Sequence, residues 1–184
     1  MGKETLPQPK LDIIEASPDE ALDIFRIQKA TWLATYPNED VGITPEMIEE
    51  RFSNMEERVQ KWKNNIEGDE SKIWIIKSDN TVVGFCGVRE GEEINRLASI
   101  YVDPQQQGGG IGGRLITQAL EYLGRDKDIV LDVASYNTNA IEFYKKHGFV
   151  VEAEVPEEDL LEIGEVKLPE TRMVLRKVEE PLNT

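Results

Sequence analysis

The feature that most constrains this chain is a cluster of glycines, since five of the six residues from Gly108 to Gly113 are glycine. Glycine has no Cβ, so its amides can approach a ligand closely and its backbone can adopt positive φ. Apolar residues at helical spacing follow directly, and the first amides of a helix favour an anion. The segment therefore predicts a pyrophosphate-binding loop. The alternative is a turn that serves the fold and binds no ligand.

The same glycines also satisfy the dinucleotide-binding spacing G-x-G-x-x-G at Gly108, Gly110 and Gly113, with Asp132 near the end of a later strand. Three observations argue against that interpretation. Residues 103–107 separate the loop from the preceding strand, and too few residues follow for several strand–helix units. The next helix, residues 137–146, is also one that a dinucleotide fold does not explain.

Patterns before the loop predict two helices and four strands. A strand is expected at residues 11–14. Ser17, Pro18 and Glu20 form a capping box with proline at the first helical position. Thr44 and Pro45 start a second helix, which we expect to run to about Asn65. Strands are expected at residues 72–76, 81–88 and 94–102, and the first two of these form a hairpin.

Patterns after the loop alternate between helix and strand. Helices are expected over residues 111–123 and 137–146, and strands over residues 129–133, 149–155 and 171–175. Residues 156–169 are an acidic connection with little patterning. The order predicts an α/β (α+β) fold with a mixed sheet and helices on both faces. We expect a flexible arm at residues 1–10, a single domain over residues 11–178 and a tail at residues 179–184.

Two segments together resemble the GNAT superfamily of N-acetyltransferases. Gln107-Gly-Gly-Gly-Ile-Gly112 is similar to the family's Q/R-x-x-G-x-G/A loop. Asn137, Tyr144 and Gly148-Phe149 match the family's second motif, one helix and one strand later. The resemblance implies a mostly antiparallel central sheet of about seven strands flanked by helices. It also implies an enzyme that transfers acetyl from acetyl-CoA to a primary amine.

The resemblance also assigns roles along the chain. The backbone of Ile100, Tyr101 and Val102 would pair with the pantetheine arm, and Asn137 would hydrogen-bond that arm. Tyr144 would protonate the departing thiolate, although an aromatic residue on an amphipathic helix can equally belong to the core. The expected cofactor-binding loop is Gln107, Gly108, Gly109, Gly110, Ile111, Gly112 and Gly113.

The general base is harder to assign. An alkyl ammonium has a pKa of ~10.4, so the site must remove a proton before the amine can attack. Many family members carry a glutamate where this chain has Arg96. Asp132, five residues before Asn137, is the better candidate. The alternative is that Asp132 pairs with a neighbouring basic group or faces solvent.

The acceptor is expected near the first two helices, around Trp32, Tyr36 and Glu39. Two aromatic rings with nearby carboxylates suit an alkyl ammonium, so a polyamine or another small amine is the favoured acceptor. Trp32 as helix core and Glu39 in a solvated loop is the competing interpretation. A protein or peptide N-terminus as acceptor, and a CoA-binding sensor without turnover, are the alternative functions.

Composition limits the partners. The formal net charge of −15 argues against nucleic acid and anionic membrane surfaces. The single histidine and single cysteine argue against a metal site of the usual kind and exclude an internal disulfide. No apolar run reaches the length of a membrane span. A cytoplasmic location is therefore expected, and a homodimer is left open.

Overall fold

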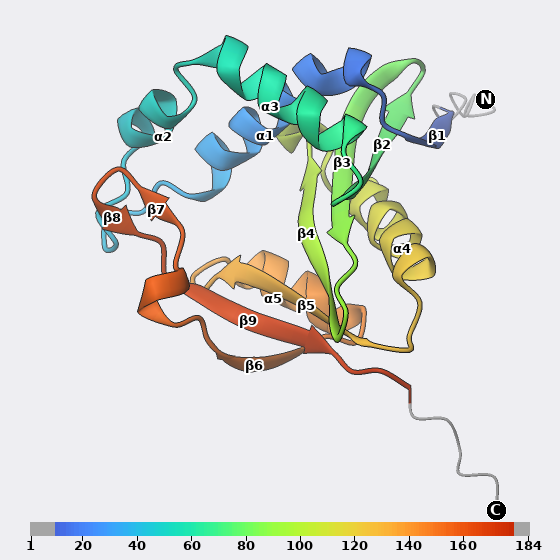
Figure 1. The fold of residues 1–184 in the computed structure, drawn as a ribbon. Coiled ribbons are helices and arrows are strands. Elements are labelled where there is room, and N and C mark those ends of the chain that lie inside the picture. Colours follow the sequence, from blue (N-terminus) through green and yellow to red (C-terminus); the bar gives the residue numbers. More distant parts are fainter. Residues whose placement is uncertain (1–9, 179–184) are drawn as a thin grey trace, which may run out of the picture.

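The computed structural model describes residues 10–178 and places a seven-stranded sheet at the centre of the fold, in the order β1-β2-β3-β4-β5-β9-β6 (Figure 1). The expected tail and all of the expected arm except Lys10 lie outside the described residues. The strands are β1 (Leu11–Glu15), β2 (Lys72–Ser78), β3 (Thr81–Arg89), β4 (Ile94–Val102), β5 (Asp128–Ala134), β6 (Val150–Glu154) and β9 (Glu170–Leu175). The seven-stranded, mostly antiparallel sheet is confirmed.

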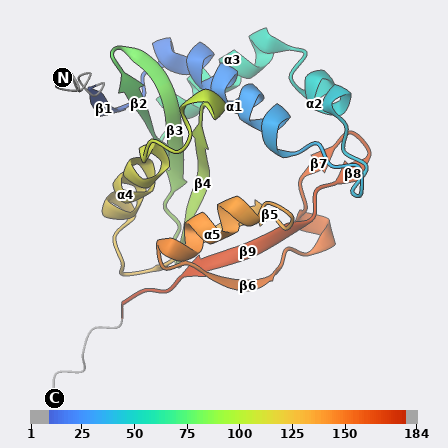
Figure 2. The same ribbon diagram turned by 180° about the vertical axis from the view of Figure 1, so that it is seen from behind.

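Helices cover both faces of the sheet, as expected (Figures 1 and 2). On one face, α1 (Ala21–Thr35) and α3 (Met55–Glu67) pack on alternate residues of β2 such as Ile73 and Ile75. On the other face, α4 (Ile111–Leu123) packs on the intervening residues of β2, including Trp74 and Ile76, and α5 (Thr138–Lys146) contributes Tyr144 to the same core cluster. Residues 73–76 are all buried because both faces of β2 are covered.

The junction between β4 and β5 is the irregular part of the sheet. These strands are parallel and pair over only three positions, the last of which joins Arg96 to Val130. Beyond that point β4 stays paired with β3 while β5 stays paired with β9. Ala98 has no partner on β3, because Gly87 pairs with Ser99 while Val88 pairs with Leu97. This β-bulge and the short pairing open a gap in the middle of the sheet.

The second predicted helix is in fact two helices, which corrects the expectation of one helix to Asn65. The first, α2 (Pro45–Arg51), ends where Phe52 turns into the core with 2% of its surface exposed. Asn54 then caps α3, since its side chain accepts a hydrogen bond from the Glu57 amide at 3.2 Å. The Asn54-x-x-Glu57 spacing is a capping signal that the helical pattern concealed.

The acidic connection also contains structure that its pattern did not predict. A short hairpin forms from β7 (Glu162–Ile163) and β8 (Val166–Lys167), with Gly164 at a φ of 62° in its turn. Ile163 and Leu168 are fully buried against the core beneath α1 and α2. Over residues 10–178, no helix has the length and apolar character that crossing a membrane requires.

Candidate active site

A cavity of about 770 Å³ follows the gap between β4 and β5. Its walls come from residues 97–102 of β4, residues 131–134 of β5, the glycine loop and the first turns of α5. Beyond Arg96, β4 no longer pairs with β5. The backbone of β4 on this side is therefore an open strand edge. An extended ligand can add to such an edge by main-chain hydrogen bonds. The predicted positions Ile100, Tyr101 and Val102 all line the cavity.

The glycine loop closes one end of this first cavity. Gly108 and Gly110 have φ of 84° and 78°, so the loop uses the left-handed conformations that glycine permits. Helix α4 begins at Ile111, and the amide of Arg114 makes the first bond back to the Gly110 carbonyl at 3.2 Å. The amides before Arg114 therefore have no acceptor within the helix. Open space lies where a Cβ would project from Gly108, Gly110 and Gly113, so no atom there obstructs an anion that approaches the loop amides.

Replacing Gly108 with alanine is expected to weaken binding of CoA, the cofactor that the resemblance implies, about tenfold, because alanine at a φ of 84° costs roughly 1–2 kcal/mol and shifts the loop amides. Gly109→Ala is the matched control, since this neighbour does not have positive φ and its added methyl meets its nearest atom at an ordinary 3.7 Å. Calorimetry with CoA measures both variants. Equal losses of CoA affinity in the two variants would show that the positive φ at Gly108 is not the cause of the weaker binding.

Helix α5 carries the two polar residues that were predicted beside the loop. Asn137 caps the helix by accepting a hydrogen bond from the Ala140 amide at 3.1 Å. The cap uses the side-chain oxygen and leaves the Nδ2 amide to donate. Tyr144, two turns further on, is 9% exposed and also lines the first cavity. Tyr144 is thus both a core aromatic and a cavity residue, so the two interpretations of it are compatible.

The Tyr144 phenol is protonated at neutral pH. Burial raises its pKa well above the ordinary value, and the neighbouring Tyr101 adds to the shift. Tyr144 can therefore donate a hydrogen bond to a negative atom in the cavity. Complete proton transfer from Tyr144 to a thiolate would be unfavourable, because the parent pKa of the thiol, ~8.5, is lower than the pKa of this phenol.

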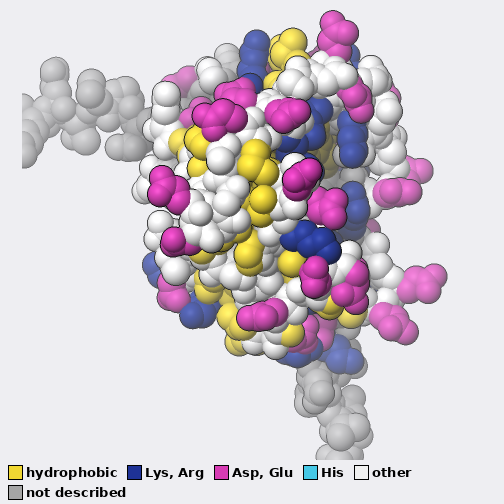
Figure 3. Space-filling model, turned by 90° about the vertical axis from the view of Figure 1, so that its left-hand side faces the viewer, with side chains coloured by type: hydrophobic (Ala, Val, Ile, Leu, Met, Phe, Trp, Pro, Cys, Tyr) yellow, Lys and Arg dark blue, Asp and Glu magenta, His cyan; other side chains and the backbone are white. Residues whose placement is uncertain are grey.

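A second cavity, of about 430 Å³, lies beside the first on the side of the sheet covered by α1 and α3. The two cavities share Tyr36, Tyr101, Asp132 and residues 97–99 of β4, so they meet at the bulge. The face drawn in Figure 3 shows several Lys and Arg side chains gathered toward the right of the view, next to a hollow. Two carboxylates, Asp132 and Glu170, also line the second cavity.

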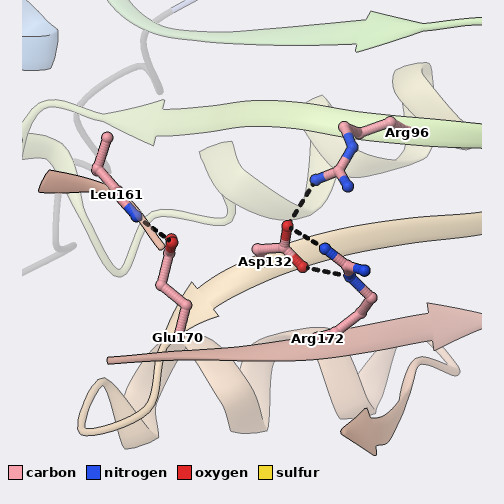
Figure 4. A network of polar contacts seen from close by, with 5 residues as sticks. All are labelled: Arg96, Asp132, Leu161, Glu170 and Arg172. Carbon is pink, nitrogen blue, oxygen red and sulfur yellow. Dashed lines mark hydrogen bonds and ion pairs between the residues drawn. The ribbon is translucent and has the colours of Figure 1, made fainter. Parts of the chain in front are cut away.

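Asp132 is held between two arginines (Figure 4). The carboxylate accepts hydrogen bonds from Arg96 Nη1 at 2.8 Å and from Arg172 at 2.8 and 3.1 Å. Burial alone would raise the pKa of Asp132, but its hydrogen bonds with Arg172 and Arg96 outweigh burial and lower the pKa below the ordinary value. The expected alternative, an ion pair with a basic neighbour, is what the structure contains. Arg96, where the resemblance led us to expect a glutamate, is one of the two partners.

Glu170 is a second carboxylate in this cavity, and sequence reasoning missed it. It lies at the start of β9, opposite Ala134 of β5, and accepts one hydrogen bond from the Leu161 amide at 3.2 Å (Figure 4). Burial raises the pKa of its carboxyl, and the charge of Asp132 adds to that effect. A carboxyl group with a raised pKa at a cavity is the usual mark of an acid or base. Only the tertiary pairing of β5 with β9 brings Glu170 here.

The predicted acceptor residues are only partly brought together. Trp32 is 5% exposed, donates to the Tyr101 hydroxyl at 3.1 Å and lines the second cavity. Tyr36 packs edge-on against Trp32 and lines both cavities. Glu39 is an exposed loop residue that lines neither cavity. The structure therefore does not bring Glu39 into the same cavity as the two aromatic rings.

Comparison with known families gives a match that spans more than half of the chain. A model of the acetyltransferase (GNAT) family matches residues 24–149. These bounds run from α1 through both cavity-lining motifs to Phe149.

Individual relatives are more distant. An uncharacterized N-acetyltransferase of Methanocaldococcus jannaschii is 29% identical over 146 residues, which span 70% of this chain and 65% of that protein. The spermidine N(1)-acetyltransferase of Vibrio cholerae is 28% identical over 66% of this chain and 73% of its own length. The crystal structure of the PaiA N-acetyltransferase of Thermoplasma acidophilum in complex with coenzyme A is 19% identical. It covers 92% of this chain and 99% of its own, with a TM-score of 0.70, which shows a shared fold.

Proposed function

Because the chain belongs to the GNAT acetyltransferase family, we propose that it is an acetyl-CoA-dependent N-acetyltransferase whose acceptor is a primary amine. One observation carries the proposal: the cavity at the glycine loop meets a second cavity at the β4 bulge, with Tyr144 in the first and Glu170 in the second. Donor and acceptor would thus enter separate cavities and react where these join.

The first cavity fits the donor. The loop amides from Gly108 to Gly113 would hold the pyrophosphate, and the open edge of β4 at residues 100–102 would pair with the pantetheine arm. Asn137 Nδ2 would donate to the same arm. Acetyl-CoA supplies the acetyl group as a thioester. Backbone amides at the bulge around Ala98 would polarise the thioester carbonyl.

Glu170 is the base that the electrostatics favour over Asp132. A carboxylate already neutralised by two guanidinium groups is a weak proton acceptor, whereas a buried one with raised pKa is a better one. Glu170 accepts the proton that the amine loses as its nitrogen bonds to the acetyl carbon. The bond to sulfur breaks, and Tyr144 stabilises the departing thiolate by a hydrogen bond. Asp132 holds Arg96 in place at the wall of the second cavity and pairs with Arg172 as well.

The acceptor amine would be that of a small molecule or of a peptide. A polyamine is the acceptor named for the Vibrio cholerae relative, and a peptidyl-lysine for a Salmonella typhimurium relative that is 34% identical over half of this chain. The loop residue Glu39 lies outside both cavities. It therefore does not join Trp32 and Tyr36 in a site for the alkyl ammonium of a polyamine.

Thiol release from acetyl-CoA, measured over a panel of amines and peptides, tests the proposal. We expect turnover that depends on the amine and saturates with both substrates. CoA binding by calorimetry without turnover on any acceptor would instead support a sensor. Binding of NAD without binding of CoA would overturn the donor assignment.

A further inference from the structure

The second cavity is basic in a strongly acidic protein. Five basic side chains line it, against the two carboxylates of Asp132 and Glu170, although the whole chain has a formal net charge of −15. Asp132 already pairs with Arg96 and Arg172, so its charge is not free to neutralise the other basic groups of the cavity. The basic residues are Arg51, Arg58, Lys61, Arg89 and Arg96.

Two of these arginines are held without a counter-ion. Arg51 Nη1 donates to the Glu162 carbonyl at 2.7 Å and its guanidinium lies over the Trp32 ring at 5.0 Å. Arg58 Nε donates to the Arg51 carbonyl at 2.6 Å, and its guanidinium lies over Phe52 at 4.7 Å. Over residues 10–178, neither guanidinium forms an ion pair with a carboxylate. Carbonyls and aromatic rings orient these groups, and the charge of Glu57 acts on Arg58 without forming an ion pair with it.

Such an arrangement is unfavourable for the protein alone. Burial lowers the pKa of both guanidinium groups, and the charge of Arg51 lowers that of Arg58 further. Arg51 Nε is buried and has no hydrogen-bond partner within the described part of the chain. Partly buried, mutually repelling cations gain stability when an anion binds between them. Arginine is also the residue best shaped to bind a carboxylate or a phosphate.

We propose that the acceptor is a small amine that also carries an anionic group, a carboxylate or a phosphate, which binds to Arg51, Arg58 and Lys61. The inference rests on the proposed function. The amine would lie at the bulge, near Glu170, while the anionic group would lie toward α2 and α3. The cavity, with a volume of about 430 Å³, is large enough to hold such a molecule. The ring of Trp32, which would otherwise attract an alkyl ammonium, already carries Arg51.

Amines of matched length test this specificity. We expect 4-aminobutanoate and 3-aminopropyl phosphate to react with kcat/KM at least tenfold above that of butylamine, because their far end carries a charge opposite to that of the arginines. We expect 1,4-diaminobutane to react with kcat/KM below that of butylamine, because its far end carries a like charge. The ratio between the first two separates a carboxylate from a phosphate site. Equal or better turnover of butylamine or diaminobutane would overturn the proposal.

Lys61 and Lys63 provide a matched pair of variants on α3, because Lys61 lines the second cavity and Lys63 lines neither cavity. We expect Lys61→Gln to raise KM for the anionic acceptors about tenfold without raising KM for butylamine. Lys63→Gln removes the same charge from the same helix and should change neither value. Equal effects of the two variants would mean that only the long-range field of the protein matters.

A binding measurement separates this inference from the proposed function. With CoA bound, calorimetry compares N-acetyl-4-aminobutanoate with N-acetylbutylamine, which lacks the carboxylate. We expect tighter binding of the acid by at least tenfold, lost in Arg58→Gln. If no amine reacts but the acid binds better, the proposed function fails and the anion site stands. If the two compounds bind equally, the anion site fails whatever the turnover.

Discussion

Replacing Glu170 with glutamine is expected to lower kcat by about 100- to 1,000-fold, the usual contribution of a positioned general base. Burial raises the pKa of this carboxyl, so the wild-type rate should rise with pH along a limb that lies above the ordinary glutamate value of ~4.3. That limb should be absent from the variant, whose remaining activity follows the ionisation of the acceptor ammonium. Steady-state pH–rate profiles measure both effects.

The fold should tolerate this change. Glutamine can still accept the hydrogen bond from the Leu161 amide. A carboxyl with a raised pKa binds its proton more tightly in the folded state, so its ionisation reduces stability as pH rises. At neutral pH the variant should therefore unfold at the wild-type temperature or slightly above it. An unchanged pH–rate profile in a folded variant would exclude Glu170 as the base.

Asp132→Asn is the contrasting variant, because its expected loss is one of stability. Removing the charge leaves Arg96 and Arg172 without their shared counter-ion, which costs about 1–3 kcal/mol in the free energy of unfolding. Since the folded-state pKa of Asp132 is lowered, its stabilisation is present at neutral pH and is lost as pH falls through that pKa. A folded variant with a large loss of kcat would return Asp132 to the role of base.

Replacing Tyr144 with phenylalanine is expected to lower kcat by about 100-fold and to leave CoA affinity within about twofold of wild type. Only the hydroxyl is removed, and the ring keeps its packing against Phe143 and Phe149. Because the phenol has a raised pKa, its contribution is a hydrogen bond to the developing thiolate. Donors with a better leaving group should therefore suffer less from the change.

Donor analogues provide the control for Tyr144. An acetyl thioester whose thiol is more acidic needs less stabilisation of the departing sulfur, so the ratio of wild-type to variant kcat should shrink with it. The ratio would stay constant if the loss came from altered packing. Unchanged kcat in Tyr144→Phe with natural acetyl-CoA would remove the hydroxyl from the mechanism.

The local patterns were enough to predict most of the fold. Residues 94–102 form the expected strand, and the capping box at Ser17 and Glu20 begins a short 3-10 turn, Pro18–Glu20, that leads directly into α1. The glycines from Gly108 and the helix carrying Asn137 and Tyr144 line one cavity, as expected from two motifs that are each local in sequence. Backbone geometry and helical periodicity act over a few residues, and the sequence displays both directly.

What the sequence did not reveal depends on contacts between distant segments. Glu170 reaches the cavity through the pairing of β9 with β5, and Arg51 is oriented by a carbonyl of the β7–β8 hairpin. Neither residue lies in a motif, and the hairpin arises from an acidic stretch without periodicity. The break between α2 and α3 was missed because Phe52 and Asn54 act through burial and capping, which a helical pattern can hide.

The short pairing of β4 with β5 has a mechanical consequence. Seven strands form one sheet, yet only three residue pairs join its β1–β4 half to its β5, β9 and β6 half. A donor whose arm occupied the gap between β4 and β5 would add main-chain hydrogen bonds where the two strands no longer pair with each other. Its binding energy would then also stabilise the folded state in which the two halves are held together.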